Sequence, residues 1–308
     1  MPFPPTLLGD SSAHWLVAGE LEALFLPGRG MLGASLRHRG EELLGRVEDL
    51  EAAAEKGSTA GIPFLYPWAN RLGAASYRCA GREVVLDLAS PLVHLDEKGL
   101  PIHGVPWARL AWEVTAATKD ALRARLDWTT AELLAVFPFR HRVELAATLL
   151  PDGLTVETSV LASAGDEVPV TFGFHPYFAL SGPPRGQWRL ALPAMRRFVL
   201  DARGIPTGAE TAFAGFDGLL GELVFDDGFA LLQQPAALCL AGPDRRLRVE
   251  LLSGYGCAQV FAPRGKAFVA LEPMTAPTDA LSGGRGLKIL QPGEEFRATF
   301  RIGVEWLG

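Results

Sequence analysis

The alternation of hydrophobic and polar residues along the chain predicts strands almost throughout. Short runs repeat with a period of two residues, which is typical of strands that bury one face. These runs cover residues 107–115, 121–128, 140–149, 154–161, 188–192, 247–252, 257–261 and 296–304. The chain also holds 34 Gly and 23 Pro residues, which interrupt it too often for long helices. We therefore predict an all-β fold.

Turn residues separate several of these runs at the short intervals of β-hairpins. Pro151-Asp152-Gly153 joins the run that ends at 150 to the run that begins at 154, and Ala80-Gly81-Arg82 separates apolar stretches at 77–79 and 84–86. Neighbouring strands are therefore expected to be antiparallel. The only good helical segment is 41–56, which is rich in Glu, Leu and Ala and is followed by Gly57 as a C-terminal stop.

Length and composition favour one large domain. The 308 residues are 48% hydrophobic, which allows a sizeable core. Neither a low-complexity linker nor a repeat of fixed period divides the chain. We predict a single domain over residues 1–308, built as a large antiparallel β-sandwich of two sheets.

Charge and cysteine content exclude several classes of function. The net charge is −6 and no cluster of Lys and Arg dominates any segment, which argues against nucleic-acid binding and favours a neutral or weakly charged ligand. The first residues show no targeting pattern, and no apolar stretch approaches the roughly 20 residues of a membrane span. We expect a cytoplasmic protein without a membrane partner. The scattered Cys79, Cys239 and Cys257 are interpreted as reduced core thiols.

Two polar residues stand in the most constrained surroundings of the chain. His175 lies in Gly173-Phe174-His175-Pro176-Tyr177-Phe178, where the proline and the aromatic residues restrict its imidazole. Glu272 lies in the apolar run 269–273, where a buried carboxylate is costly unless it is paired. Together they offer an acid and a base. The alternatives are a packed structural histidine and a structural ion pair.

Three further residues are candidates for binding. Arg71 follows Asn70 in a proline-stiffened aromatic loop and presents five fixed donors, although a surface arginine beside a structural asparagine fits the same pattern. His103 is bracketed by prolines, which also suits a loop histidine bonded to a backbone carbonyl. The pair Asp226-Asp227 is either part of a site or a solvated turn.

Taken in order, five short motifs resemble those of the aldose 1-epimerase family, the galactose mutarotases and their relatives. The resemblance covers residues 24–304. The motifs are Asn70-Arg71, His103-Gly104, His175-Pro176-Tyr177-Phe178, Leu271-Glu272-Pro273 and Leu290-Gln291-Pro292-Gly293-Glu294. Each motif is weak by itself, but their order and spacing are those of the family.

The resemblance implies a β-sandwich of unusual size, the supersandwich, with a sugar cleft on one concave face. It implies that His175 is the general acid and Glu272 the general base, and that Arg71 and His103 bind the sugar. Asp226 is the best match to the family's sugar-binding aspartate, with Asp227 as the alternative. The expected reaction is interconversion of the α and β anomers of a monosaccharide, with no cofactor and no metal.

The sequence leaves the substrate open. Phe174 stands where many galactose mutarotases have asparagine, and the motif that follows is closer to the hexose-phosphate epimerases. A hexose 6-phosphate 1-epimerase is therefore an alternative, with Arg264 and Lys266 as candidates to hold a phosphate. A non-catalytic sugar sensor is an alternative of another class. A metal site made of His103, His175 and Glu272 lacks any short ligand spacing. Oligomeric state cannot be predicted.

Overall fold

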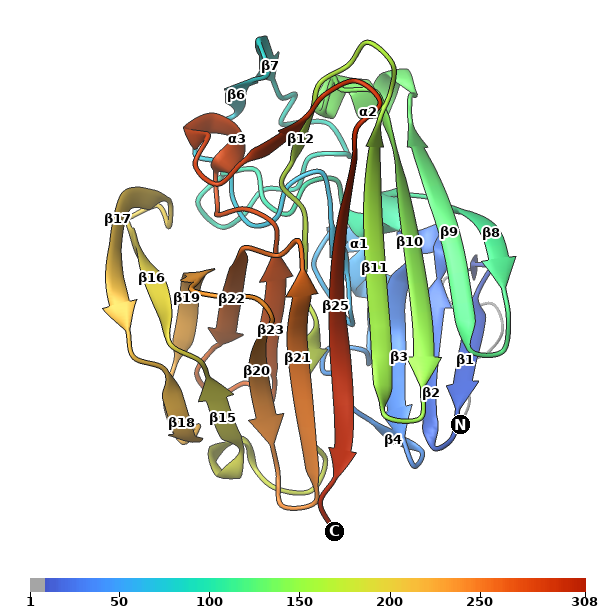
Figure 1. Ribbon diagram of the computed structural model, residues 1–308, viewed down its shortest axis with the longest axis vertical. Helices are drawn as coiled ribbons and strands as arrows, with labels where there is room; N and C mark the ends of the chain where they lie inside the picture. The colour runs from blue at the N-terminus through green and yellow to red at the C-terminus, as the bar shows by residue number, and fades with distance from the viewer. Residues whose placement is uncertain (1–8) are drawn as a thin grey trace.

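The computed structural model describes residues 9–308, and long strands dominate it (Figure 1). The largest sheet has nine strands whose paired neighbours are antiparallel. In spatial order they are β18 (Phe216–Leu219), β15 (Arg189–Leu192), β20 (Ala236–Ala241), β21 (Arg245–Ser253), β25 (Glu295–Trp306), β11 (Gly153–Ala162), β10 (His141–Leu150), β9 (Ala121–Trp128) and β8 (Glu113–Ala117). The prediction of an all-β fold with large antiparallel sheets is confirmed.

A second large sheet has eight strands and carries most of the residues discussed below. Its strands are β17 (Pro206–Phe213), β16 (Met195–Leu200), β19 (Phe225–Leu231), β22 (Cys257–Ala262), β23 (Val269–Met274), β13 (Gly173–Phe174) and β5 (Phe64–Leu65), with β14 (Tyr177–Phe178) also paired to β23. A four-stranded sheet contains β1 (His14–Ala18), β2 (Leu21–Leu26), β3 (Leu32–His38) and β4 (Glu41–Glu42). Two small ribbons pair β6 (Ser76–Cys79) with β7 (Arg82–Val85) and β12 (Val168–Val170) with β24 (Lys288–Leu290).

One hydrophobic core joins the three larger sheets. It includes Leu16 of β1, Leu145 of β10 and Val260 of β22, all fully buried. Along β10 buried and less buried residues alternate, as the sequence pattern predicts for a strand with one face on the core. Each large sheet packs one of its faces against this core. The polar residues on the other face of the eight-stranded sheet are therefore free to line a site.

Helices are short. They are α1 (Leu50–Lys56), α2 (Ala131–Val136) and α3 (Ala280–Gly283), and among residues 9–308 no helix is long and apolar enough to cross a membrane. Cys79 and Cys257 are buried and Cys239 is partly buried, and all three are free thiols. The prediction of a single domain stays a prediction.

The predicted helix over 41–56 is wrong in its first half. Residues Glu41–Glu42 form β4 and pair with β3, and the helix begins only at Leu50, where the Asp49 side chain accepts a hydrogen bond from the Ala52 amide. Between them, the Gly45 amide donates to the Tyr177 carbonyl. Tertiary hydrogen bonds to β14 therefore override the local helix propensity of this segment.

The predicted run 107–115 also differs at its start. Trp107–Arg109 form a 3₁₀ turn, and the strand β8 covers Glu113–Ala117 instead. Both proline and glycine precede the turn, which favours a tight turn over extended chain at this point.

Candidate active site

A cavity of about 210 Å³ opens where the eight-stranded sheet meets several loops. Strands β19, β22 and β23 supply one wall, the segment around β14 another, and loops near α1 and before β6 and β8 the rest. The lining residues are Arg46, Thr59, Asn70, Arg71, Ile102, His103, His175, Tyr177, Asp226, Gln259, Phe261 and Glu272. The fold therefore brings together all the candidate residues Arg71, His103, His175, Asp226 and Glu272, which lie far apart in the sequence.

Strand register places His175 opposite Glu272. Strands β13 and β14, which flank His175, both pair with β23 in one antiparallel register, and this register sets position 175 against 272. On the other side of β23, Gln259 pairs with Glu272, so the three side chains project from one face of the sheet. Gly173 permits the close approach of β13 to β23, because a Cβ at position 173 would lie 2.8 Å from the Pro273 carbonyl oxygen.

The His175 imidazole is held by direct contacts with Glu272 and Tyr177. Its Nε2 lies 3.2 Å from Glu272 Oε1, and the two side chains are only 7% and 2% exposed. The ring stacks on Tyr177 with 4.3 Å between centroids, and Tyr177 Oη lies 3.3 Å from the same Nε2. Tyr177 Oη also shares a 2.6 Å hydrogen bond with Thr59 Oγ1. His175 Nδ1 is buried and has no hydrogen-bond partner among the described residues.

Burial controls the protonation of this pair. Desolvation lowers the pKa of His175 well below its usual value, with a further contribution from His103. Desolvation also raises the pKa of Glu272 well above its usual value, and the negative charge of Asp226 adds to the effect. Both shifts favour the neutral forms, a neutral imidazole and a protonated carboxyl group, which together hold one proton between Nε2 and Oε1. Transfer of that proton from Glu272 to His175 yields a carboxylate and an imidazolium.

His103 lies beside the pair at the cavity wall. Its ring is 5.5 Å from the His175 ring and nearly perpendicular to it. Desolvation, followed by the charge of Arg71, lowers the pKa of His103 to about 3, so this ring is neutral at pH 7. Its backbone has a φ of 62° and is followed by Gly104, where a Cβ would clash with the Tyr66 carbonyl oxygen at 2.1 Å. A glycine is thus required at position 104, because the tight turn packs against Tyr66, the residue that follows β5.

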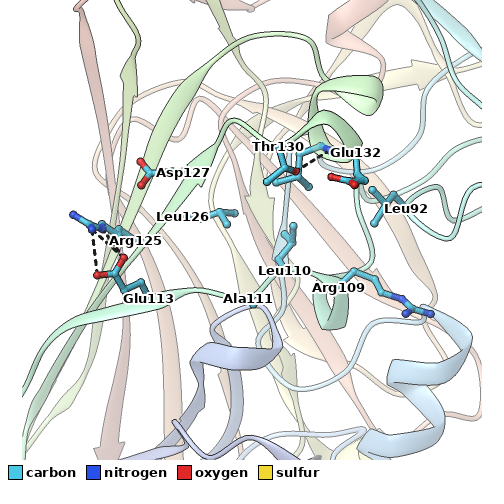
Figure 2. Close-up of a pocket in the computed structure, with 11 residues that line it drawn as sticks. Leu92, Arg109, Leu110, Ala111, Glu113, Arg125, Leu126, Asp127, Thr130 and Glu132 are labelled. Atoms are coloured by element: carbon cyan, nitrogen blue, oxygen red, sulfur yellow. Dashed lines mark hydrogen bonds and ion pairs between the residues drawn. The ribbon is translucent and has the colours of Figure 1, made fainter.

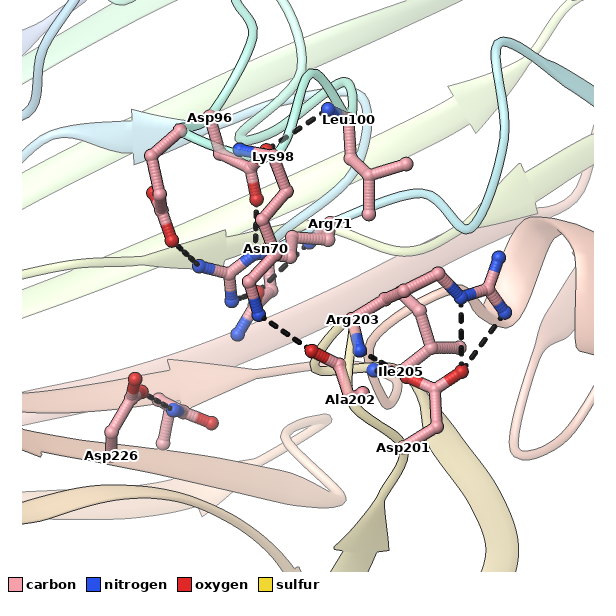
Figure 3. Close-up of polar contacts among 12 residues, drawn as sticks. Asn70, Arg71, Asp96, Lys98, Leu100, Asp201, Ala202, Arg203, Ile205 and Asp226 are labelled. Atoms are coloured by element: carbon pink, nitrogen blue, oxygen red, sulfur yellow. Dashed lines mark hydrogen bonds and ion pairs between the residues drawn. The ribbon is translucent and has the colours of Figure 1, made fainter.

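Arg71 is anchored by acidic residues of the neighbouring loop (Figure 3). Its Nε donates to Asp96 Oδ2 at 2.5 Å, and Nη2 lies 3.6 Å from Glu97 Oε1. Asp96 Oδ1 in turn accepts from the backbone amides of Lys98 and Leu100. Burial by itself would raise the pKa of Asp96, but the bond from Arg71 and these amides hold the pKa below its usual value. The Arg71 guanidinium is therefore fixed in direction and its charge is balanced.

The turn between β16 and β17 closes this side of the site. Asp201 Oδ1 accepts from the amides of Arg203 and Ile205, which shapes the turn, and Lys98 Nζ donates to the Ala202 carbonyl oxygen at 3.0 Å (Figure 3). Arg203 Nη1 donates to the Gly73 carbonyl oxygen at 3.0 Å. These contacts tie the turn to the loop that carries Arg71.

The structure distinguishes Asp226 from Asp227. Asp226 lines the cavity and its Oδ1 accepts from Gln259 Nε2 at 2.9 Å. Asp227 is not part of the lining and lies 3.5 Å from Arg197 Nε. Because successive residues of a strand face opposite sides, only one of the two side chains can point into the cavity.

Comparisons with known proteins identify the family of this chain. Residues 34–303 match the aldose 1-epimerase family. The chain belongs to that family. It is 28% identical over 306 residues to the uncharacterized protein YphB of Escherichia coli K12, covering 90% of this chain and 97% of YphB.

Solved structures show the same aldose 1-epimerase fold. A putative aldose 1-epimerase from Escherichia coli K12 has a TM-score of 0.77 at 22% identity, covering 96% of this chain and 99% of that protein. A galactose mutarotase-like protein from Clostridium acetobutylicum has a TM-score of 0.79 at 20% identity, covering 95% of both chains. At these identities the likeness supports the fold alone, and it confirms the predicted galactose mutarotase-like sandwich.

A larger cavity of about 460 Å³ lies elsewhere on this family member (Figure 2). Leu110, Leu126 and Leu133 form its apolar part, and the ion pair between Arg125 and Glu113 stands at its edge. None of the candidate residues lines it. Size alone would therefore select a cavity that contains none of the candidate residues.

Sequence reasoning missed four polar residues at or behind the site. Gln259 interrupts the run 257–261 and carries the same signal as Glu272, a polar residue among buried neighbours. Thr59 and Asp96 gave no signal, because their roles depend on Tyr177 and Arg71 across the fold. Arg46 fell inside the helix predicted for 41–56.

The structure also gives the positions of the two cationic residues that were considered for a phosphate site. Arg264 and Lys266 do not line the cavity, and Arg264 instead lies 3.8 Å from Glu222 in an exposed pair. Within residues 9–308 there is no group of three or more His, Cys, Asp or Glu placed to hold a metal ion.

Proposed function

We propose that the protein is an aldose 1-epimerase that interconverts the α and β anomers of a hexose. The observation that carries this proposal is the buried pair of His175 Nε2 and Glu272 Oε1, 3.2 Å apart at the wall of a cavity of about 210 Å³. Opening a pyranose ring requires removal of the proton on O1 and delivery of a proton to O5. The pair offers a base and an acid for these two proton transfers.

Glu272 acts as the base and His175 as the acid. The Glu272 carboxylate takes the proton from the anomeric hydroxyl while the His175 imidazolium gives its proton to O5, and the C1–O5 bond breaks to leave an aldehyde. Rotation about C1–C2 exposes the other face of the aldehyde. The ring closes with the two proton transfers reversed, which restores both residues. Each transfer contributes roughly 10²–10⁴ in rate, or about 3 to 5 kcal/mol of the barrier.

The surrounding polar groups bind and orient the sugar. Arg71 presents a guanidinium fixed by Asp96, and Asp226 presents a carboxylate oriented by Gln259. The neutral His103 offers a ring nitrogen beside the ring oxygen without adding a second positive charge next to His175. Directional hydrogen bonds of this kind suit sugar hydroxyls.

The test follows optical rotation of freshly dissolved α-glucose and α-galactose. We expect kcat/KM to fall by roughly 10²–10⁴ in Glu272→Gln, because an amide cannot accept the O1 proton. Asp227→Asn is the matched control, since this carboxylate lies on β19 of the same sheet but outside the cavity. A folded Glu272→Gln protein with the wild-type rate would overturn the assigned base. Tight sugar binding by the wild type without any acceleration would identify a sensor instead.

The pH dependence provides a second test of the shared proton. Below the lowered pKa of His175 both residues are protonated and no base remains, and above the raised pKa of Glu272 the pair has lost its proton and no acid remains. We therefore expect a bell-shaped profile of kcat/KM, with its acid limb below the usual pKa of a histidine and its basic limb above the usual pKa of a glutamate. A rate that rises steadily up to high pH would contradict the need for an acid.

A further inference from the structure

One cation at the cavity wall has no acidic partner. Arg46 lines the cavity, and its guanidinium carbon lies 5.1 Å from the centre of the Tyr177 ring and 5.9 Å from that of Phe268. Arg46 forms no ion pair or hydrogen bond with any residue in 9–308. Two aromatic faces thus hold the guanidinium in place while its N–H donors stay available.

The backbone is bent to bring Arg46 to this position. Arg46 has a φ of 60°, a left-handed conformation that costs a residue with a Cβ about 1 kcal/mol or more. The preceding Gly45 bonds to the Tyr177 carbonyl, and a Cβ on Gly45 would lie 2.9 Å from Phe268 Cβ. Packing of residues 45 and 46 against β14 therefore imposes a conformation that aims the arginine at the cavity.

The other cations near the site are already balanced. Arg71, the second arginine of the lining, is bonded to Asp96 and lies near Glu97. Arg264 lies outside the lining and is paired with Glu222. Arg46 is therefore the residue at this cavity with a positive charge to offer to a ligand.

The position of Arg46 relative to the catalytic pair selects one part of the sugar. In the proposed reaction Glu272 meets O1 and His175 meets O5, so C1 lies on the Glu272 side of the imidazole. The atom on the other side of O5 is C5, which carries C6. His175 Nε2 has Tyr177 Oη as its second neighbour at 3.3 Å, and Arg46 lies over the Tyr177 ring. A substituent on C6 would therefore extend toward Tyr177 and Arg46.

We propose that Arg46 forms an anion subsite, and that the substrate is an aldose with a negatively charged group, a phosphate or a carboxylate, at C6. The proposal rests on the proposed function for the orientation of the ring. Asp226 and Glu272, the two acidic residues of the lining, come from β19 and β23, and neither forms an ion pair with Arg46 that would neutralise its charge. A guanidinium matches the geometry of both anions.

The first experiment compares substrates in matched variants. NMR exchange spectroscopy would measure kcat/KM for glucose, glucose 6-phosphate and glucuronate in the wild type, Arg46→Gln, Arg46→Lys and Arg264→Gln. We expect the wild type to prefer one of the anionic sugars, and the ratio of its kcat/KM to that of glucose to fall roughly 10- to 100-fold in Arg46→Gln. Arg46→Lys should retain part of the preference, and the exposed control Arg264→Gln should retain all of it.

Glucose 6-phosphate and glucuronate distinguish a phosphate from a carboxylate as the charged group of the substrate. If the ratio of kcat/KM for an anionic sugar to that for glucose is the same in the wild type and in Arg46→Gln, the subsite is overturned.

The second experiment separates this result from the proposed function. Calorimetry would measure binding of 1-deoxyglucose and its 6-phosphate and of the corresponding 1-deoxyuronic acid, which have no anomeric hydroxyl and cannot react. Tighter binding of a charged analogue that is lost in Arg46→Gln supports the subsite even if no sugar is epimerised. Acceleration with neutral sugars alone, with no Arg46-dependent binding of either anion, refutes the subsite and leaves the epimerase intact.

Discussion

Two buried histidines contact tyrosine hydroxyls, one in the packed core and one in the cavity. His141 is fully enclosed, stacks on Trp128 and bonds through Nε2 to Tyr66 Oη. Its Nδ1 donates to the Phe139 carbonyl oxygen at 2.6 Å, so Nε2 accepts the Tyr66 proton and both nitrogens are satisfied. His175 contacts Tyr177 in a similar way, but its Nδ1 lacks a partner and its Nε2 also meets the Glu272 carboxyl.

The comparison shows which features distinguish the proposed proton donor His175 from the core histidine His141. Burial lowers the pKa of both, to about 4 for His141 and well below the usual value for His175, so burial and the direction of the pKa shift do not distinguish them. The differences are the unsatisfied nitrogen, the adjacent carboxyl and the open cavity. A structural histidine needs complete hydrogen bonding, whereas a proton donor needs a place for the substrate.

The largest expected difference comes from the same substitution at both sites. His175→Asn should lower kcat/KM by roughly 10²–10⁴, because the proton donor is lost. His141→Asn should leave the rate per folded molecule unchanged but lower the free energy of unfolding by about 2 to 4 kcal/mol, because it opens a cavity and leaves Tyr66 Oη unpaired. Mutarotation rates and urea unfolding would measure the two effects. Comparable losses of activity in both variants would contradict the distinction.

The next effect is the contribution of the core histidine His141 to the pH dependence of stability. In the unfolded chain His141 takes up a proton near its usual pKa of 6.5, but in the folded protein only at about 4. The unfolded state thus binds more protons between these values, so the stabilisation is complete above pH 6.5 and is lost as the pH falls toward 4. His141 should account for a loss of roughly 2 to 3 kcal/mol between pH 7 and pH 4.5. Urea unfolding of the wild type and His141→Asn at both pH values tests this: the stability gap should narrow on acidification, and a constant gap would refute it.

The smallest expected effects concern the two tyrosine hydroxyls. Tyr66→Phe should cost about 1 to 2 kcal/mol of stability, since it leaves the buried Nε2 of His141 without a donor, and it should not change the rate. Tyr177→Phe removes the hydroxyl beside the reactive Nε2, and the loss of about 1 kcal/mol of interaction should slow the reaction roughly fivefold. Kinetics and thermal unfolding of both variants would show whether the two hydroxyls serve different purposes.

The strands could be predicted well from the sequence because one face of each meets a single core. The runs predicted at 121–128, 140–149 and 154–161 correspond to β9, β10 and β11, where apolar residues alternate with exposed ones. Segment 41–56 shows the limit of this reasoning. Its composition favours a helix throughout. In the first half, however, residues 41 and 42 pair with β3 and the Gly45 amide donates a hydrogen bond to the Tyr177 carbonyl, and these tertiary contacts override the helix propensity.

The candidate site could be predicted only where the local sequence was unusual. His175 and Glu272 stood out because a histidine among prolines and aromatics and a carboxylate in an apolar run are costly without a reason. Thr59 and Arg46 could not be found in this way, because neither conflicts with its own neighbours. Their place at the cavity follows from contacts with Tyr177, more than 100 residues away.

The sequence by itself determined the all-β class, the main strands and turns, and the ordered motifs that resemble the aldose 1-epimerase family, because these depend on local periodicity and residue chemistry. Only the tertiary structure decided which polar groups share the cavity: it placed Asp226 inside and Asp227 outside, and it set Arg46 beside Tyr177. The physical reason is that a side chain's charge, hydrogen bonding and access to a ligand depend on strand register and on distant loops. In this fold the register of β13, β14 and β23 joins His175 to Glu272.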